Sequence, residues 1–199
     1  MTKKFDNVYQ FRIELQEIKP PVWRRIQVPE TYTFWDLHVA IQDSMGWTDS
    51  HLHEFAIRNP KTRRMINIGF PDEDFGRKVS KGWKKKIADF FSPQNPEAGY
   101  TYDFGDNWRH IVILEAILPR QKGVKYPLCL AGERSCPPED CGGIHGYEDF
   151  LEIIMDPKHE EHDSMLEWVG GEFSPEHFDC SGVVFDDPAE RLKSLDEDF

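Results

Sequence analysis

The stretch "YTYDFGDNWRHIVILEAIL" (residues 100–118) constrains the fold most, because it contains two strand-like runs on either side of a tight turn. The turn "FGDN" (104–107) holds Gly, Asp and Asn, which tolerate positive φ angles and hydrogen-bond the turn backbone. We therefore predict a β-hairpin. The second run carries apolar residues on both faces from Ile111 to Leu118, a pattern typical of a central strand covered on both sides.

Elements before the hairpin follow from periodicity and from capping residues. "VYQFRIEL" (8–15) alternates apolar and polar residues like a half-buried strand, and "VWRRIQV" (22–28) predicts a second strand after a proline break. Thr33 is suited to begin a helix and Gly46 to end it. His38 lies on the apolar stripe of this helix, so we interpret it as a core-edge histidine rather than a ligand.

Helices dominate the C-terminal third. Gly142-Gly143 precedes a predicted helix with Glu148 and Asp149 in its first turn, and "EEHDSMLEWVGG" (160–171) predicts another helix. The acidic final stretch predicts one helical turn and a frayed end. Because strands lead and helices follow, the pattern indicates the α+β class, with a mainly antiparallel sheet covered by helices.

Acidic residues are concentrated toward the C-terminus. Residues 1–120 hold 18 basic and 16 acidic side chains, whereas residues 121–199 hold 6 and 20. Such a surface repels phosphate, and we interpret the basic run "RKVSKGWKKK" (77–86) as a solvated segment, so we predict no nucleic-acid partner. We place a single domain at 1–182 and an acidic tail at 183–199.

Neither a membrane span nor a secretory leader is predicted. The sequence has no run of eighteen apolar residues, and its start, "MTKKFDNVYQF", lacks the apolar core of a signal peptide. We therefore predict a cytoplasmic protein without membrane association.

The four cysteines do not have the spacing of a structural zinc site. Cys129, Cys136, Cys141 and His145 are separated by 7, 5 and 4 positions, whereas zinc sites use closely spaced cysteine pairs. In a reducing compartment we expect free thiols and no bound metal. If this stretch bound a metal, its ligands would be Cys136, Cys141 and His145.

Carboxylates and imidazoles gather in three motifs, which form the candidate functional site. "HLHEFAIR" (51–58) predicts a strand with both histidines on one face, where they could hold an ion or simply be solvated. His110 follows the hairpin turn beside two aspartates, which could help it bind an ion or move a proton, or could lock the turn. "CPPEDCGG" (136–143) is a stiff loop that we expect to turn Glu139 or Asp140 toward the hairpin. The candidate residues are His51, His53, Asp103, Asp106, Trp108, His110, Glu139 and Asp140.

Several long motifs carry a family resemblance. They run in order from about Val8 to Asp179 and include "PPVWRRIQVPETYTFWDLHVAIQDSMGWTDSHLHEFAI", "YTYDFGDNWRHIVILE" and "YPLCLAGERSCPPEDCGGIHGYEDFLE". The chain resembles the plasmid open-reading-frame-three-like family, also described as passenger TnpR-like proteins of insertion elements. The resemblance implies an α+β domain found in bacteria and archaea, often on plasmids or mobile elements. It implies no proven activity.

Two functions of different classes fit these residues. The first is a non-enzymatic module that takes a protein segment or a small ligand in an aromatic-lined groove, although the same aromatic residues could simply pack the core. The groove residues would be Trp47, His51, His53, Tyr102, Trp108 and the 136–143 loop. The second is a metal-dependent hydrolase of phosphodiester or similar bonds, in which the ion activates water.

The sequence predicts no cofactor, with a divalent metal as the alternative. It leaves open whether the chain is an enzyme, what it binds and its oligomeric state. It also leaves open whether the charge-rich residues 59–99 are ordered.

Overall fold

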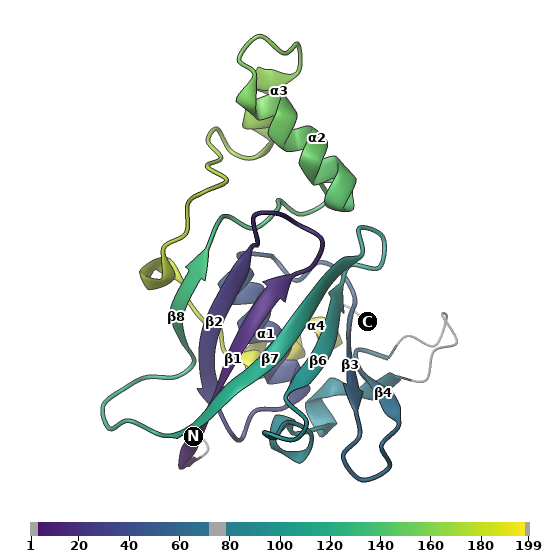
Figure 1. Ribbon diagram of the computed structural model, residues 1–199, viewed down its shortest axis with the longest axis vertical. Coiled ribbons are helices and arrows are strands. Elements are labelled where there is room, and N and C mark those ends of the chain that lie inside the picture. The colour runs from purple at the N-terminus through teal and green to yellow at the C-terminus, as the bar shows by residue number, and fades with distance from the viewer. Residues whose placement is uncertain (1–3, 72–78, 198–199) are drawn as a thin grey trace.

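An eight-stranded sheet forms the framework of the molecule (Figure 1). The computed structural model describes residues 4–71 and 79–197. The strand order is β5-β4-β3-β6-β7-β1-β2-β8, and neighbours pair antiparallel except β4 with β5. The predicted α+β class with a mainly antiparallel sheet is confirmed. The strands are β1 (Asn7–Leu15), β2 (Trp23–Pro29), β3 (His53–Arg58), β4 (Met65–Gly69), β5 (Val79–Lys81), β6 (Glu97–Tyr102), β7 (Trp108–Pro119) and β8 (Leu128–Glu133).

Helices and short helical turns complete the described part of the chain. No helix in that part is long and apolar enough to cross a membrane. The α-helices are α1 (Phe34–Met45), α2 (Gly143–Met155), α3 (His162–Trp168) and α4 (Pro188–Glu197). The 3₁₀ turns are η1 (Gly82–Lys84), η2 (Ile87–Asp89) and η3 (Cys180–Gly182).

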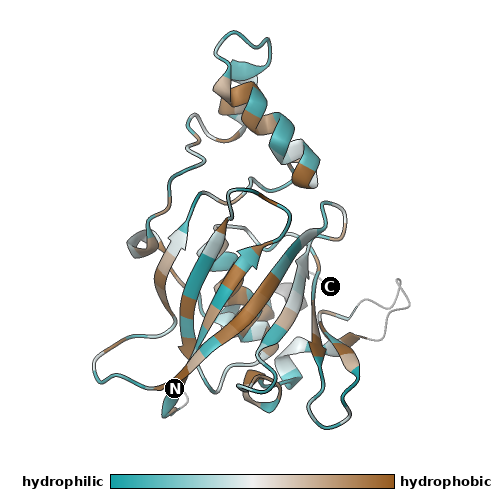
Figure 2. Cartoon of the chain, in the orientation of Figure 1, coloured by the Kyte–Doolittle hydropathy of each residue, from teal (hydrophilic) through white to brown (hydrophobic). Residues whose placement is uncertain are grey.

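The hydrophobic core lies between one face of the sheet and α1, which Figure 1 shows behind the strands. Phe11 of β1 and Val112 of β7 point into this core and are fully buried. On the opposite face Arg25 and Glu115 form an ion pair at 2.6 Å, and Figure 2 shows the alternation of polar and apolar residues along the strands. The sheet therefore has one buried and one solvated face.

The strand β7 is central, but it is covered on one face only. Its two neighbours are β6 and β1, as the prediction of a central strand requires. Ile111 and Ile113 on the solvated face are only half-buried, because that face carries charged side chains instead of a helix. The prediction of cover on both sides was therefore wrong. The sequence pattern alone does not distinguish an apolar side chain on a solvated sheet face from one that is buried.

The helix α1 begins and ends where its capping residues predict. The Thr33 hydroxyl accepts a hydrogen bond from the Asp36 amide, and the Asp36 carboxylate accepts one from the Thr33 amide. Gly46 ends the helix with a left-handed φ of 89°. These reciprocal bonds satisfy amides that a helix start leaves free. The defined end of α1 therefore fixes where the following loop begins beside the sheet.

The C-terminal third differs from the prediction in two details. The helix α2 starts at Gly143, so Glu148 and Asp149 lie beyond its first turn. The final stretch forms the ten-residue helix α4 rather than a single turn. The indole N–H of Trp35 on α1 donates to the carbonyl of Pro188, at 2.8 Å. Tertiary contacts of this kind stabilise a helix that its polar sequence only weakly predicts.

The basic run at 77–86 is described only in part. Its first two residues lie outside the described residues. Residues 79–84 form β5 and η1, in which Lys81 and Lys84 are exposed. The second 3₁₀ turn, η2, follows directly after this run.

Candidate functional site

Three segments that are distant in sequence meet at one end of the sheet. They are the loop after α1, the turn between β6 and β7, and the loop between β8 and α2. The indole N–H of Trp47, just after α1, donates to the carbonyl of Pro137 at 2.9 Å. The buried Trp47 ring also stacks on Tyr102, the last residue of β6, with 5.0 Å between ring centroids. These contacts fix all three segments relative to one another.

The hairpin turn is organised by Asp103. One oxygen of its carboxylate accepts a hydrogen bond from the Gly105 amide at 2.8 Å. The Asp103 backbone has a φ of 54°, a left-handed value that aspartate tolerates better than most residues. The second oxygen lies 3.6 Å from Nε2 of His51. Asp103 thus locks the turn and also faces the loop after α1.

The loop before α2 contributes two further carboxylates. Glu139 accepts hydrogen bonds from the Tyr102 hydroxyl at 2.6 Å and from the Thr48 amide at 3.0 Å, and also bonds the Thr48 hydroxyl. Burial, followed by the bond to Glu139, raises the pKa of Tyr102. Asp140 lies 2.9 Å from Nε2 of His51. The expected turn of this loop toward the hairpin is present.

His51, Asp103 and Asp140 together form what we term the exposed cluster. One potential ligand atom from each residue lies within 4.8 Å of the others. The exposed fractions of the side chains are 30%, 10% and 69%, so solvent reaches the group. One imidazole and two carboxylates suit borderline and hard divalent ions. The arrangement is also a plain imidazole–carboxylate pair that ties two loops together.

The structure brings five of the eight predicted site residues into one region. The Gly142 amide donates to Asp106 at 3.2 Å, which ties the turn to the loop before α2. These five residues are His51, Asp103, Asp106, Glu139 and Asp140. The remaining three, His53, Trp108 and His110, are buried in the core instead.

The aromatic groove expected from the sequence is core packing. Trp47, Tyr102 and Trp108 are at most 5% exposed, and His53 is also buried. Trp47 packs against both Tyr102 and Trp108. The alternative that the sequence left open, aromatic residues filling the core, therefore describes this region.

His110 does not lie beside carboxylates as expected. Its Nδ1 bonds the carbonyl of Trp108 at 3.1 Å and, more weakly, that of Tyr100 at 3.4 Å. Its Nε2 has no hydrogen-bond partner among the described residues. Burial lowers the pKa of His110 to about 4, so the ring is neutral at physiological pH. The Asp103 and Asp106 carboxylates bond the Gly105 and Gly142 amides instead.

His53 belongs to a second group, which sequence reasoning missed. Its ring stacks on that of His38 from α1, with centroids 3.4 Å apart. Nε2 of His38 lies 2.6 Å from a carboxylate oxygen of Asp49. We term His38, Asp49 and His53 the buried cluster. The expectation of a solvated imidazole at His53 was wrong, although Phe55 and Ile57, which follow at two-residue spacing, mark that face as buried.

Comparison with known proteins identifies the family of this chain. The family described as plasmid pRiA4b ORF-3-like proteins matches residues 7–182. The chain belongs to the plasmid pRiA4b ORF-3-like family. The resemblance carried by its sequence motifs is thereby confirmed.

Two relatives of this ORF-3-like chain cover most of its length. The uncharacterized protein y4hQ of Sinorhizobium fredii (strain NBRC 101917 / NGR234) is 36% identical over 165 residues, which are 82% of this chain and 81% of y4hQ. The crystal structure of MM3350, a protein of unknown function from Methanosarcina mazei Go1, matches with a TM-score of 0.85 and 49% identity. That match covers 92% of this chain and 100% of MM3350.

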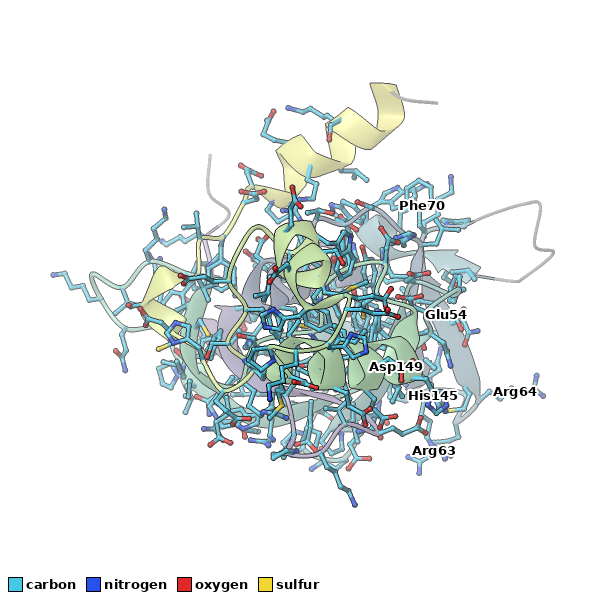
Figure 3. All side chains as sticks on the ribbon, turned by 90° about the horizontal axis from the view of Figure 1, so that it is seen from above. Glu54, Arg63, Arg64, Phe70, His145 and Asp149 are labelled. Atoms are coloured by element: carbon cyan, nitrogen blue, oxygen red, sulfur yellow. The ribbon has the colours of Figure 1, made fainter. Side chains whose placement is uncertain are left out.

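In this ORF-3-like chain, the surroundings of the two thiols in the loop before α2 differ from those of the His145 imidazole. Partial burial raises the pKa of the Cys136 thiol and raises that of Cys141 to about 12. The His145 side chain on α2, labelled in Figure 3, is 96% exposed and pairs with Glu148. Neither thiol is thiolate-like at neutral pH, which disfavours nucleophilic chemistry at these positions.

An open cleft borders the loop before α2 at Cys136 to Glu139. Its volume is about 370 Å³. The cleft is lined by the end of α1, by Cys136 to Glu139, and by Trp168, Val169 and Phe173. Trp168 is 48% exposed and offers an aromatic surface to this cleft. The same loop that carries Asp140 therefore forms one wall of a cleft that exposes polar and apolar atoms about equally.

Proposed function

We propose that this chain is a ligand-binding module whose exposed cluster holds a divalent cation, with a small ligand or protein segment bound alongside. The observation that carries the proposal is the meeting of His51, Asp103 and Asp140 from three segments within 4.8 Å. Metal ligands must lie about 2.0–2.6 Å from one ion, so only small movements would be needed.

The charges of the exposed cluster favour a cation. Asp103 and Asp140 face one imidazole, and Glu139 and Asp106 lie on the same two loops. Like charges gathered on neighbouring loops repel unless a cation compensates them. Glu139 and Asp106 are occupied by hydrogen bonds to Thr48, Tyr102 and Gly142, so they would orient the loops rather than ligate.

The neighbouring cleft supports the proposed binding of a small ligand or protein segment. Clefts that combine apolar side chains with polar groups are typical of sites for small molecules and peptide segments. The half-exposed Trp168 provides a large aromatic surface for such a ligand. Because one loop borders both features, an ion on Asp140 and a ligand in the cleft would stabilise the same backbone.

Titration with Mn²⁺ tests the cation site. We expect the metal-free protein to bind one Mn²⁺ per chain in isothermal titration calorimetry. Asp140→Asn should weaken binding about tenfold or more, since one charged ligand is lost and tenfold corresponds to about 1.4 kcal/mol. Asp140 is mostly exposed, so this variant should retain its fold.

A matched control distinguishes a specific cation site from nonspecific Mn²⁺ binding to acidic side chains. His162 and the exposed Asp163 also form an imidazole–carboxylate pair, at 3.0 Å, which is not part of a three-residue group among the described residues. Asp163→Asn should therefore leave Mn²⁺ binding unchanged. Equal weakening in both variants, or no binding by the natural chain, would contradict the cation site.

The second candidate function is a metal-dependent hydrolase of phosphodiester or similar bonds. One observation favours it: three protein ligands leave coordination positions open for water and substrate, as in catalytic metal sites. A bound ion would lower the pKa of its water and so supply the nucleophile.

Turnover of bis(4-nitrophenyl) phosphate distinguishes the two candidates. The hydrolase predicts Mn²⁺-dependent release of 4-nitrophenolate that is lost in Asp103→Asn, a variant that keeps an acceptor for the Gly105 amide. Mn²⁺ binding without turnover would contradict the hydrolase and leave the binding module. Asp163→Asn is again the control, with activity equal to that of the natural chain.

A further inference from the structure

The buried cluster has the composition of a metal site. His38 and His53 are almost completely buried, and Asp49 has a side chain that is 7% exposed. One potential ligand atom from each of the three residues lies within 4.8 Å of the others. Two imidazoles and one carboxylate form a ligand set that divalent iron and other first-row transition metals accept in proteins.

Several polar atoms of this region have no hydrogen-bond partner among the described residues. They include Nε2 of His53, one carboxylate oxygen of Asp49 and the side-chain oxygen of Gln42. Gln42 and His38 both bond the hydroxyl of Tyr100, at 2.9 Å each, so these atoms belong to one neighbourhood. Buried polar atoms almost always have partners, and a group of exceptions points to a bound water or ion.

The charged side chains around the buried cluster favour a bound cation. Arg191 of α4 contacts Asp43 at 2.6 Å, Asp186 at 2.6 Å and Asp49 at 3.8 Å. Asp43 and Asp49 are buried whereas Asp186 is 60% exposed, so the buried carboxylates outnumber the single guanidinium by one. A cation bound among them would offset this excess negative charge and reduce the cost of burying it.

We propose that His38, Asp49 and His53 bind a first-row transition-metal ion at a site separate from the exposed cluster. Two imidazoles favour zinc, iron, cobalt or nickel over magnesium and calcium, which prefer oxygen ligands. The site lies under α4, whose Arg191 bonds Asp43 and approaches Asp49. The helix therefore closes this site from solvent.

Metal binding requires one ring to turn. The His38 and His53 planes are nearly parallel, with 8° between them, so their in-plane lone pairs cannot meet at one ion. Rotation of the His53 ring about its Cβ–Cγ bond would unstack the rings and redirect its unpartnered Nε2. The proposal therefore predicts that metal binding separates the two stacked rings.

Titration of the metal-free protein with Co²⁺ tests the proposal. In Asp140→Asn, which disables the exposed cluster, we expect one Co²⁺ per chain with the visible absorption of a nitrogen- and oxygen-ligated ion. Asp49→Asn and His53→Gln should each weaken this binding at least about tenfold. His110→Gln is the matched control, because His110 is equally buried, has an unpartnered nitrogen and lies outside the three-residue groups.

A second measurement needs no variant. Zn²⁺ should shift the ring-nitrogen resonances of both His38 and His53 in the ¹⁵N-labelled natural chain. Unchanged resonances for these rings, or Co²⁺ binding that disappears entirely in Asp140→Asn, would overturn the buried site. Because Mn²⁺ at the exposed cluster is measured separately, failure of one site leaves the other standing.

Discussion

At the scale of single residues, the aspartates at the site combine a turn conformation with a charge. Asp103 and Asp140 have φ angles of 54° and 57°, a region that aspartate enters more readily than most residues. One oxygen of Asp103 holds the Gly105 amide and the other faces His51. The two interpretations of this residue, turn lock and ligand, are therefore compatible. Asn at this position keeps the turn bond and removes the charge.

Gly143 allows a close contact between the hairpin turn and the loop before α2. It has a φ of 70°, and a Cβ added there would lie 2.6 Å from the carbonyl oxygen of Asp106. We predict that Gly143→Ala lowers the free energy of unfolding by roughly 2–4 kcal/mol, from left-handed strain plus steric overlap with backbone. Urea unfolding measures this loss.

Gly142 provides the control for this prediction. Its φ is 90°, but an added Cβ would meet only the Cα of Gly146, at an ordinary 3.6 Å. Gly142→Ala should therefore cost only the backbone strain, about 1 kcal/mol. Equal losses in the two variants would mean that Asp106 does not press on Gly143.

At the scale of elements, local signals predicted those elements that local interactions stabilise. The Thr33 capping box and Gly46 define α1, and alternation defines β1. The helix α4 had no such signal, because its anchors are Trp35 and Asp43 on α1, more than a hundred residues away. This helix lies beyond the family match at 7–182, yet it covers the buried cluster.

The candidate site was predictable in part for the same reason. Turn chemistry and loop stiffness identified Asp103, Glu139 and Asp140, whose orientation depends on nearby backbone. The partnership of His38 with His53 was not predictable, since it arises only when α1 packs on β3. Alternation assigns a side chain to a face of a strand, but it does not say whether that face meets a helix or water.

At the scale of the whole molecule, the fold buries several histidines as neutral rings. Burial lowers the pKa values of His38, His53 and His110. An unfolded chain exposes these rings with a pKa of about 6.5, so it takes up protons more readily than the folded chain. Burial raises the pKa of Asp49 to about 6, which has the opposite effect on stability as pH falls. The balance between the buried histidines and Asp49 therefore sets how the free energy of unfolding changes as the pH falls.

His110 allows this sensitivity to be measured at one residue. Its ring contacts Tyr100, Trp47 and backbone carbonyls, none of which is charged near neutral pH. Its folded-state pKa of about 4 lies below the unfolded value of about 6.5, so its contribution is complete above pH 6.5 and is lost as pH falls toward 4. The shift corresponds to roughly 3 kcal/mol.

We therefore predict that the free energy of unfolding falls more steeply between pH 6.5 and 4 in the natural chain than in His110→Leu. Leucine fills a similar volume and cannot be protonated, so the difference between the two slopes isolates the ring. Chemical denaturation at a series of pH values measures both curves, and the variant's lower absolute stability does not affect the comparison. His145→Leu is the control, because the His145 side chain is 96% exposed and should leave the slope unchanged. Parallel curves for the natural chain and His110→Leu would mean that His110 is protonated as easily in the folded chain as in the unfolded one, which its burial beneath Trp47 and Tyr100 argues against.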